Sequence, residues 1–495
     1  MTTTLSRLSR ATLGALPAGV AAPGYDIDAV TPGILHVGLG NFHRAHQAVY
    51  LDDLFAKGLS HDWGILGAGV MDYDAEQRKA LMAQDCLYTV VEQDGAGDAA
   101  RVIGAMRGFL PVEPGCAAIL AAMADTTIRI VSMTVTEGGY FIDPATGVFD
   151  PSQAAIRHDI ANPDRPKTIF GAIVAGLKAR RAAGEVPFTV MSCDNVPHNG
   201  RVARDVVVGI AEGQDTALAA WIKDTVAFPN GMVDRITPAT TEARRKYLRD
   251  TFGVEDARPV FCEPFRQWVL EDKFTAGRPK LEDVGVQFVP DVTPYENMKI
   301  RILNGGHACI AYAGHLMGCH YAHNAMEHPL VSAFLEKVER DEIIPVVAPV
   351  PDTSLEDYFT LIRQRFSNPR IEDEIRRLCL DGSNRQPKFI VPSARDNLAK
   401  GRAVPGLALE SALWCRYCYG EDEQGVVIEP NDPDWDRLTR QARAARDNPA
   451  AWLEMGDIYG DVAKAEAFRA DFIGWLNRLW AEGTETVVRD YLGKA

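Results

Sequence analysis

The sequence has no long hydrophobic run. Although 46% of its 495 residues are apolar, no segment approaches the roughly 20 consecutive apolar residues that a membrane-spanning helix needs. Residues 1–23 carry Arg7 and Arg10 but no continuous apolar stretch, so we expect no secretory signal. These absences argue against a membrane partner and favour a cytoplasmic protein.

Cysteines in paired spacing are also lacking. The nine cysteines are scattered along the chain, which is typical of reduced thiols rather than of a disulfide framework. Cys415 and Cys418 form one C-x-x-C, but no second pair lies near them. A structural zinc site normally uses four ligands, so we predict no metal site and keep a redox or metal role for this pair as the minor alternative.

Positive charge is in deficit. The chain has 52 Lys and Arg against 67 Asp and Glu, giving a formal net charge of −15. This balance argues against nucleic acid as a partner. It leaves room for a local cationic pocket that binds a small anionic cofactor.

Strand-like and helix-like segments alternate in the first part of the chain, after a lead-in over residues 1–30 that we expect to be loosely structured. Gly33–Gly40 predicts a buried strand, and a helical pattern follows from Phe42 to Leu54. β-Branched or apolar runs predict further strands at residues 63–70, 87–92, 100–103, 128–135 and 188–193. Such alternation predicts an α/β fold with a mostly parallel sheet.

Long helical patterns dominate after residue 293. They cover residues 298–317, 328–344, 355–366, 370–380, 402–419 and 465–480. We therefore place a boundary near Thr293-Pro294. Residues 1–293 are predicted to form a dinucleotide-binding domain, and residues 294–495 a largely α-helical substrate and catalytic domain.

A glycine turn joins the first predicted strand to the first predicted helix. Gly38 and Gly40 stand where backbone N–H groups can approach a pyrophosphate, and Phe42, His43 and Arg44 follow at once. His43 occupies the place of the third glycine of G-x-G-x-x-G, so by itself the motif fits an ordinary turn equally well. Arg44 could pair with phosphate, or lie exposed on the helix.

Acidic residues follow the second predicted strand, where a carboxylate commonly binds the adenosine ribose. Asp72, Asp74 and Glu76 are the candidates, and the alternative is a solvated acidic loop. A carboxylate there would repel a 2′-phosphate. NAD is therefore expected in preference to NADP.

The segment Tyr295–His307 concentrates chemically active side chains. On a regular helix, Glu296, Lys299, Asn304 and His307 would fan over an arc of roughly 140°. Packing alone does not require a carboxylate, a lysine, an amide and an imidazole on one face. The alternative is that Gly305-Gly306 interrupts the helix before His307.

Several separate motifs stand out in chain order: Gly38-Leu39-Gly40-Asn41-Phe42-His43-Arg44-Ala45-His46-Gln47, Thr136-Glu137-Gly138-Gly139-Tyr140, Ser192-Cys193-Asp194-Asn195, Met232-Val233-Asp234-Arg235-Ile236-Thr237-Pro238 and Lys299 with Asn304-Gly305-Gly306-His307. Together, over nearly the whole chain, they resemble the motifs of the polyol-specific long-chain dehydrogenases. The resemblance implies a zinc-independent monomer with a Rossmann-type N-terminal domain, a helical C-terminal domain and an active site between them. It further implies NAD-dependent interconversion of a linear polyol and its ketose, with mannitol and fructose expected first and arabinitol or sorbitol next.

The resemblance assigns roles to individual residues. Lys299 corresponds to the general base, which acts only when neutral and so needs a lowered pKa. Asn195 and Asn304 correspond to paired amides that stabilise a developing alkoxide. His307 corresponds to a substrate-orienting residue, and Glu296 to a carboxylate that relays the proton to solvent.

Other positions correspond to binding contacts. Asp234, Arg377 and Arg385 fall where the family contacts substrate hydroxyls, although its mannitol-oxidising members carry lysine at the position of Arg385. Glu137 is expected to contact the cofactor or to support the site. The predicted cofactor contacts are Gly38, Gly40, Phe42, His43, Arg44, Asp72 and Glu137.

Each of these residues also has an ordinary structural interpretation. A lone lysine is usually solvated, a lone histidine is usually a core residue, Asp234-Arg235 could be an ion pair, and Arg377 could lie on a solvated helix face. Two other functions stay open. A hexuronate reductase would need a cation for the substrate carboxylate, for which Arg377 and Arg385 are available. A non-catalytic dinucleotide sensor would be expected to have lost Lys299 or the paired amides, and both are present.

Overall fold

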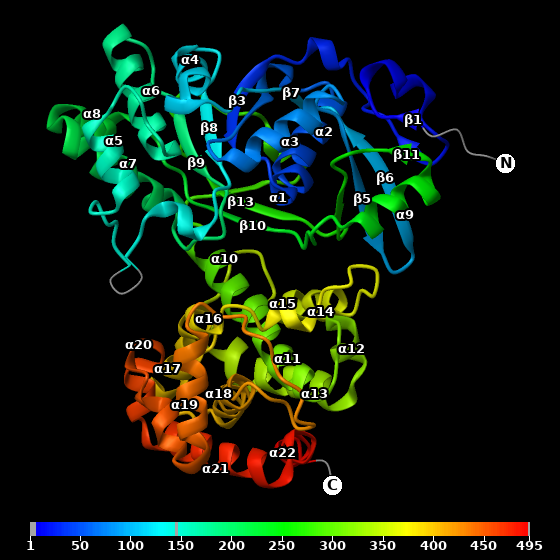
Figure 1. Cartoon of the computed structure of the whole chain (residues 1–495), viewed down its shortest axis with the longest axis vertical. Helices are drawn as coiled ribbons and strands as arrows, with labels where there is room; N and C mark the ends of the chain where they lie inside the picture. Colours follow the sequence, from blue (N-terminus) through cyan, green and yellow to red (C-terminus); the bar gives the residue numbers. More distant parts are fainter. Residues whose placement is uncertain (1–5, 144–146, 494–495) are drawn as a thin grey trace. The chain divides into compact units, whose positions relative to one another are not determined.

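The computed structural model describes residues 6–143 and 147–493, and it divides into two compact units, Met1–Val292 and Thr293–Ala495 (Figure 1). Every strand in these ranges belongs to the first unit, and the second unit is built from helices. No helix in the described ranges is long and apolar enough to cross a membrane.

A parallel sheet of five strands forms the centre of the first unit. Its order is β7-β4-β3-β8-β9, and every neighbouring pair is parallel. The order reverses between β3 and β8, which is the point where open α/β sheets bind ligands, beyond the carboxyl ends of the strands. The strands are β3 (Pro32–Val37), β4 (Gly64–Ala68), β7 (Met106–Phe109), β8 (Ile130–Met133) and β9 (Thr189–Ser192).

Both faces of this sheet are buried, as expected for a parallel sheet. Ile34 of β3 joins a core cluster with α2 (Gln47–Ala56). Leu35 and Val37 point to the opposite face and join a second core cluster with Ile119, Ile173 and Val206, which come from three different helices. The near-continuous apolar sequence of β3 therefore follows from burial on both sides.

Two smaller sheets complete the first unit, with orders β12-β5-β6-β2 and β10-β13-β14, and β1 pairs with β11. Their strands are β1 (Ser6–Arg7), β2 (Val20–Ala21), β5 (Tyr88–Asp94), β6 (Gly97–Ile103), β10 (Gly231–Asp234), β11 (Val254–Glu255), β12 (Val260–Cys262), β13 (Gln267–Glu271) and β14 (Gln287–Val289). Its remaining α-helices are α1 (Asn41–Ala45), α3 (Asp72–Met82), α4 (Ala117–Ala124), α5 (Ala154–Ala161), α6 (Ile169–Ala183), α7 (Asn199–Gln214), α8 (Thr216–Thr225) and α9 (Glu242–Phe252).

In the second unit, α11 packs against α13, α15 and α18, and α18 packs along α21. The elements are α10 (Thr293–Met298), η7 (Lys299–Asn304), α11 (Gly305–Leu316), α12 (Ala322–Glu327), α13 (Pro329–Val338), η8 (Glu339–Ile343), α14 (Leu355–Phe366), α15 (Ile375–Leu378), α16 (Gly382–Phe389), α17 (Val391–Ala399), α18 (Pro405–Cys418), α19 (Trp435–Asp447), α20 (Gly456–Tyr459), α21 (Glu466–Glu482) and α22 (Thr484–Tyr491).

Three local expectations were wrong. The lead-in contains β1, β2 and two short 3₁₀ helices (Arg10–Ala15 and Ile27–Ala29). The helix expected over residues 42–54 is two helices, because the backbone of His46 leaves helical geometry at φ −121° and ψ −86°. The long helix expected over residues 370–380 shrinks to the single turn of α15.

Candidate active site

The glycine turn after β3 lies at the sheet reversal. Gly38 has φ +93°, and a Cβ there would come within 2.1 Å of the carbonyl oxygen of Thr134, which follows β8. Gly40 is the N-cap of α1, and a Cβ there would meet nothing within 4 Å. The turn is thus tight against the sheet at Gly38 and open at Gly40, as a cradle for a dinucleotide requires.

The residues after the turn face inward. Arg44 is 2% exposed and donates hydrogen bonds to the carbonyl oxygens of Leu39 and Arg258 and to Asn41. Phe42 stacks on His46 with ring centroids 4.9 Å apart. Arg44 therefore braces the turn, and a direct contact with the cofactor stays a prediction.

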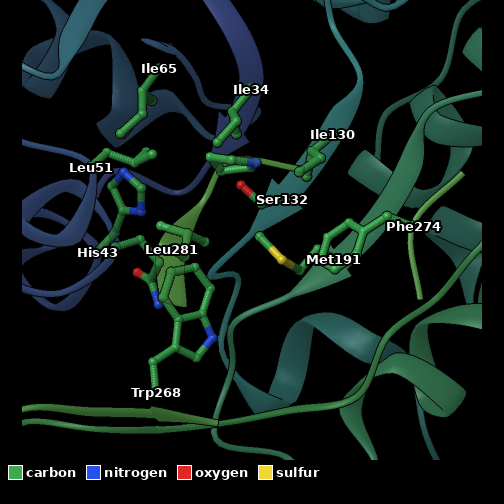
Figure 2. Close-up of a pocket in the computed structure, with 12 residues that line it drawn as sticks. Ile34, His43, Leu51, Ile65, Ile130, Ser132, Met191, Trp268, Phe274 and Leu281 are labelled. Carbon is green, nitrogen blue, oxygen red and sulfur yellow. The ribbon is translucent and has the colours of Figure 1, made fainter. Parts of the chain in front are cut away.

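His43 lies in the core, beside a cavity of about 10 Å³ (Figure 2). Its ring stacks on that of His36 at 3.4 Å, and His36 shares a 2.8 Å hydrogen bond with Ser132. Burial lowers the pKa of His36 to about 3 and that of His43 well below its usual value, so both rings are neutral. A cavity of this size holds about one water molecule, so it is not a substrate pocket.

The acidic segment after β4 is a helix, so the alternative of a solvated acidic loop is wrong. Asp74 is 6% exposed, accepts a hydrogen bond from the backbone of Met71 and contacts Gly69, so its role is structural. Asp72 and Glu76 are exposed, and Asp72 is the first residue of α3. Of the three acids, Asp72 keeps the place expected for a ribose ligand.

A buried aspartate joins the loops that follow β8 and β9. The carboxylate of Asp194 accepts hydrogen bonds from the N–H groups of Val135 and Thr136 at 3.0 and 2.9 Å, and from the hydroxyl of Tyr140 at 2.7 Å. Asn195, the next residue, is exposed. Glu137 lies in the same loop, but its side chain is outside the described part of the structure.

Asp234 ends β10 and is 6% exposed. Its neighbour Arg235 pairs with Glu92 at 2.6 Å and donates to the carbonyl oxygens of Ala45 and Glu263. The guanidinium of Arg235 thus links the end of β10 to β5, through Glu92, and to α1, through Ala45. This arrangement holds the carboxyl end of β10 in place.

In the second unit, the helix predicted over residues 298–317 continues through Gly305 and Gly306, so the alternative of a break at these glycines is wrong. Its irregularity comes earlier, where Lys299–Asn304 forms a π-helix between α10 and α11. π-Segments occur frequently at functional sites. One extra residue in a turn rotates the following positions back by about 100° around the helix axis. The angle between Lys299 and His307 around this axis is therefore about 20°, whereas it would be about 80° in a regular helix.

The imidazole of His307 lies in a positive environment. Burial, followed by the charges of Arg377, Arg365, Arg385 and Lys299, lowers the pKa of His307 well below its usual value. The ring stacks on Phe366 at 4.2 Å with 17° between the planes. A neutral imidazole held in one orientation can donate a hydrogen bond to a hydroxyl or accept one from it.

Lys299 is 5% exposed and Glu296 is 6% exposed, and both make polar interactions. Asn304 is half-buried, and in the described ranges its side-chain amide has no hydrogen-bond partner. The helical unit thus carries a buried lysine, a buried carboxylate and an available amide on consecutive turns. That set can accept a proton and stabilise a nearby oxyanion.

The two arginines predicted to bind substrate already make hydrogen bonds within the protein. Arg377 donates from Nε and Nη2 to Asp373, both at 2.5 Å. Arg385 donates to the carbonyl oxygen of Leu378 at 3.2 Å. No group of three or more His, Cys, Asp or Glu suited to a metal ion occurs among the residues that the structure describes.

Family comparison agrees with this layout. Residues 32–283 match the mannitol dehydrogenase Rossmann domain, and residues 291–480 match the mannitol dehydrogenase C-terminal domain. The chain belongs to the mannitol dehydrogenase family. The fold is therefore the Rossmann-type domain plus helical domain of that family of oxidoreductases, which confirms the predicted fold class.

Individual proteins also match this chain over nearly their full length. Mannitol 2-dehydrogenase of Cereibacter sphaeroides is 62% identical over 473 residues, covering 96% of this chain and 99% of that protein. The solved ternary complex of Pseudomonas fluorescens mannitol 2-dehydrogenase with NAD and D-mannitol is 42% identical, with a TM-score of 0.88, and covers 99% of this chain and 100% of that one. A substrate-free D-sorbitol dehydrogenase is 37% identical, with a TM-score of 0.89, over 97% and 100% of the two chains.

Sequence reasoning missed three supporting residues. Asp194 was noticed only as part of a motif, Asp373 was not singled out, and Phe366 was expected only as part of a helix. Asp194 binds Val135, which lies 59 residues away in the sequence. Asp373 binds Arg377, which lies 4 residues away. Phe366 stacks on His307, which belongs to another helix. Only the i, i+4 spacing of Asp373 and Arg377 was a readable signal.

Proposed function

We propose that this protein is an NAD-dependent polyol dehydrogenase that interconverts a linear polyol and its ketose, with mannitol and fructose as the first candidates. The observation that carries the proposal is the π-segment, which brings Lys299 and His307 toward one side of the helix. Membership of the mannitol dehydrogenase family and the named relatives support it.

In the proposed reaction, the hydroxyl proton of the substrate passes to Nζ of Lys299, while the adjacent carbon loses its hydride. NAD, when bound, supplies the hydride acceptor. The NH₂ groups of Asn195 and Asn304 stabilise the alkoxide as charge develops on its oxygen. His307 orients the substrate, and Glu296 passes the proton from Lys299 to solvent.

The cofactor assignment is supported by the first unit. Gly38 and Gly40 form the turn at the sheet reversal, and exposed Asp72 opens α3 after β4. A carboxylate there accepts hydrogen bonds from ribose hydroxyls and repels a 2′-phosphate. NAD is accordingly proposed in preference to NADP.

The substrate assignment is supported by how the arginines are paired. Asp373 offsets the charge of Arg377, and Nη1 of Arg385 donates to backbone carbonyl oxygens. That pairing favours uncharged hydroxyls over a carboxylate. The second candidate is a hexuronate reductase, which the cations around His307 favour because they create a positive field.

A substrate panel with both cofactors tests these assignments. Purified protein is assayed with mannitol, arabinitol, sorbitol, fructose and fructuronate, each with NAD(H) and NADP(H). We expect the highest kcat/KM for mannitol or fructose with NAD(H). Negligible turnover of every neutral ketose, together with turnover of fructuronate, would replace the polyol assignment by the hexuronate one. Light scattering of the same preparation tests the expected monomer.

A further inference from the structure

A buried carboxyl lies against the helix that carries Asn304 and His307. Glu339 begins the second π-segment, η8, and is 0% exposed. Neither carboxyl oxygen has a hydrogen-bond partner in the described parts of the chain. Burial, and after it the charge of Glu356, raises the pKa of Glu339 well above its usual value, so the side chain carries its proton.

This carboxyl packs on Gly306. A Cβ on Gly306 would lie 3.1 Å from Oε1 of Glu339, 3.4 Å from Leu335 and 3.5 Å from Phe366. Phe366 in turn stacks on His307. The side chains of Glu339, Leu335 and Phe366 therefore pack against the backbone that joins Asn304 to His307, and we call these three side chains the floor.

The neighbouring acid on the same segment is different. Glu342 accepts hydrogen bonds from the N–H groups of Gly406 and Leu407 at 2.7 and 2.8 Å. Glu339 has no such partners, and a buried polar group without partners costs stability that an apolar side chain of the same shape would not. An unpaired acid at this place calls for a role other than stability.

We propose that Glu339, through its packing on Gly306, is a positioning residue for the reaction. It supports the backbone at Gly306 from behind and thereby sets the directions of Asn304 and His307. It does not touch the substrate. This inference rests on the proposed function, because it takes Asn304 and His307 to be substrate contacts.

Glu339→Ala and Glu339→Gln test the proposal in the full-length enzyme with D-mannitol and NAD. Loss of the floor should raise the KM for mannitol roughly tenfold in Glu339→Ala, since small misplacements of binding groups are costly, and leave the KM for NAD unchanged. Glu339→Gln keeps the shape and neutrality, so it should restore the wild-type KM. The matched control Glu342→Gln should lower the melting temperature without changing the KM for mannitol.

An unchanged KM for mannitol in Glu339→Ala overturns the proposal, as does a Gln variant that behaves like the Ala variant. If Glu339→Ala does not fold, Gly306→Ala decides. Its Cβ presses on the same floor, so its KM for mannitol should rise, and an unchanged value overturns the proposal. Should the wild-type enzyme turn over fructuronate but not mannitol, the polyol assignment fails, and the same variants are measured with fructuronate.

Discussion

Arg377 and Asp373 form a fork in which two hydrogen bonds of 2.5 Å join the guanidinium to both carboxylate oxygens. Asp373 is buried, whereas 49% of the Arg377 side chain is exposed. Paired bonds of this kind fix the guanidinium plane as well as its place. The aspartate thus decides how much positive charge Arg377 presents to a ligand.

Asp373→Asn should increase the affinity of the site for anions. The amide keeps the shape but removes the negative charge, so Arg377 presents a full cation. We expect a lower inhibition constant for a sugar acid such as mannonate and a higher KM for mannitol. Asp457→Asn, which breaks the separate Arg437–Asp457 pair of 2.8 Å, is the control. Equal inhibition constants for Asp373→Asn and the wild type would contradict this view of Arg377.

Lys299→Ala should lower kcat by about 10²–10⁴-fold, the usual contribution of a general base. The remaining activity should lose the limb of the pH profile that reports the base. Lys337→Ala, at a half-buried lysine paired with Asp341, controls for the loss of a lysine in the same unit. A variant with the wild-type rate and pH profile would remove Lys299 from proton transfer.

Four strands of the parallel sheet, β3, β4, β8 and β9, could be predicted from the sequence because they are largely buried and read as nearly continuous apolar runs. The edge strand β7 was missed, because Met-Arg-Gly-Phe is not such a run. The strand β10 could not be predicted, because four residues ending in Asp234 give no period. The π-segment Lys299–Asn304 was also missed, since the apolar pattern predicted a regular helix over residues 298–317. The family motifs pointed to site residues, whereas Asp194 and Phe366 depend on contacts that are distant in the sequence.

Asp194→Ala should destabilise the first unit and lower kcat/KM. Its carboxylate holds two backbone N–H groups and the hydroxyl of Tyr140, and buried groups that lose such partners cost about 1–3 kcal/mol each. The loop beside Asn195 would also lose its brace. Asp125→Ala is the control, because exposed Asp125 bonds the backbone and hydroxyl of Thr127. Similar urea midpoints for the two variants would contradict a bracing role.

Gly38→Ala should weaken NAD binding and stability together. A Cβ would meet the Thr134 carbonyl oxygen at 2.1 Å, in addition to the strain of φ +93°. Gly58→Ala is a matched control, because Gly58 has φ +74° but nothing within 4 Å of a Cβ; it should lose only about 1 kcal/mol from backbone strain. Fluorescence titration with NADH measures the difference, and equal affinities in the two variants would show that the close approach is unimportant.

Glu410→Gln should become more stable relative to the wild type as pH rises from 5 to 8. Glu410 is fully buried and accepts a hydrogen bond from Gln386 at 2.6 Å, and burial raises its pKa from 4.5 to about 8. The folded state keeps this proton while the unfolded chain releases it. The stability contributed by the neutral acid is therefore complete below pH 4.5 and is lost as pH approaches 8.

Glutamine does not ionise, so the difference in urea midpoint between Glu410→Gln and the wild type should shift in favour of the variant at pH 8. The control Glu466→Gln, at an exposed site, should show no such shift. A midpoint difference that is the same at both pH values would contradict a protonated Glu410 in the fold.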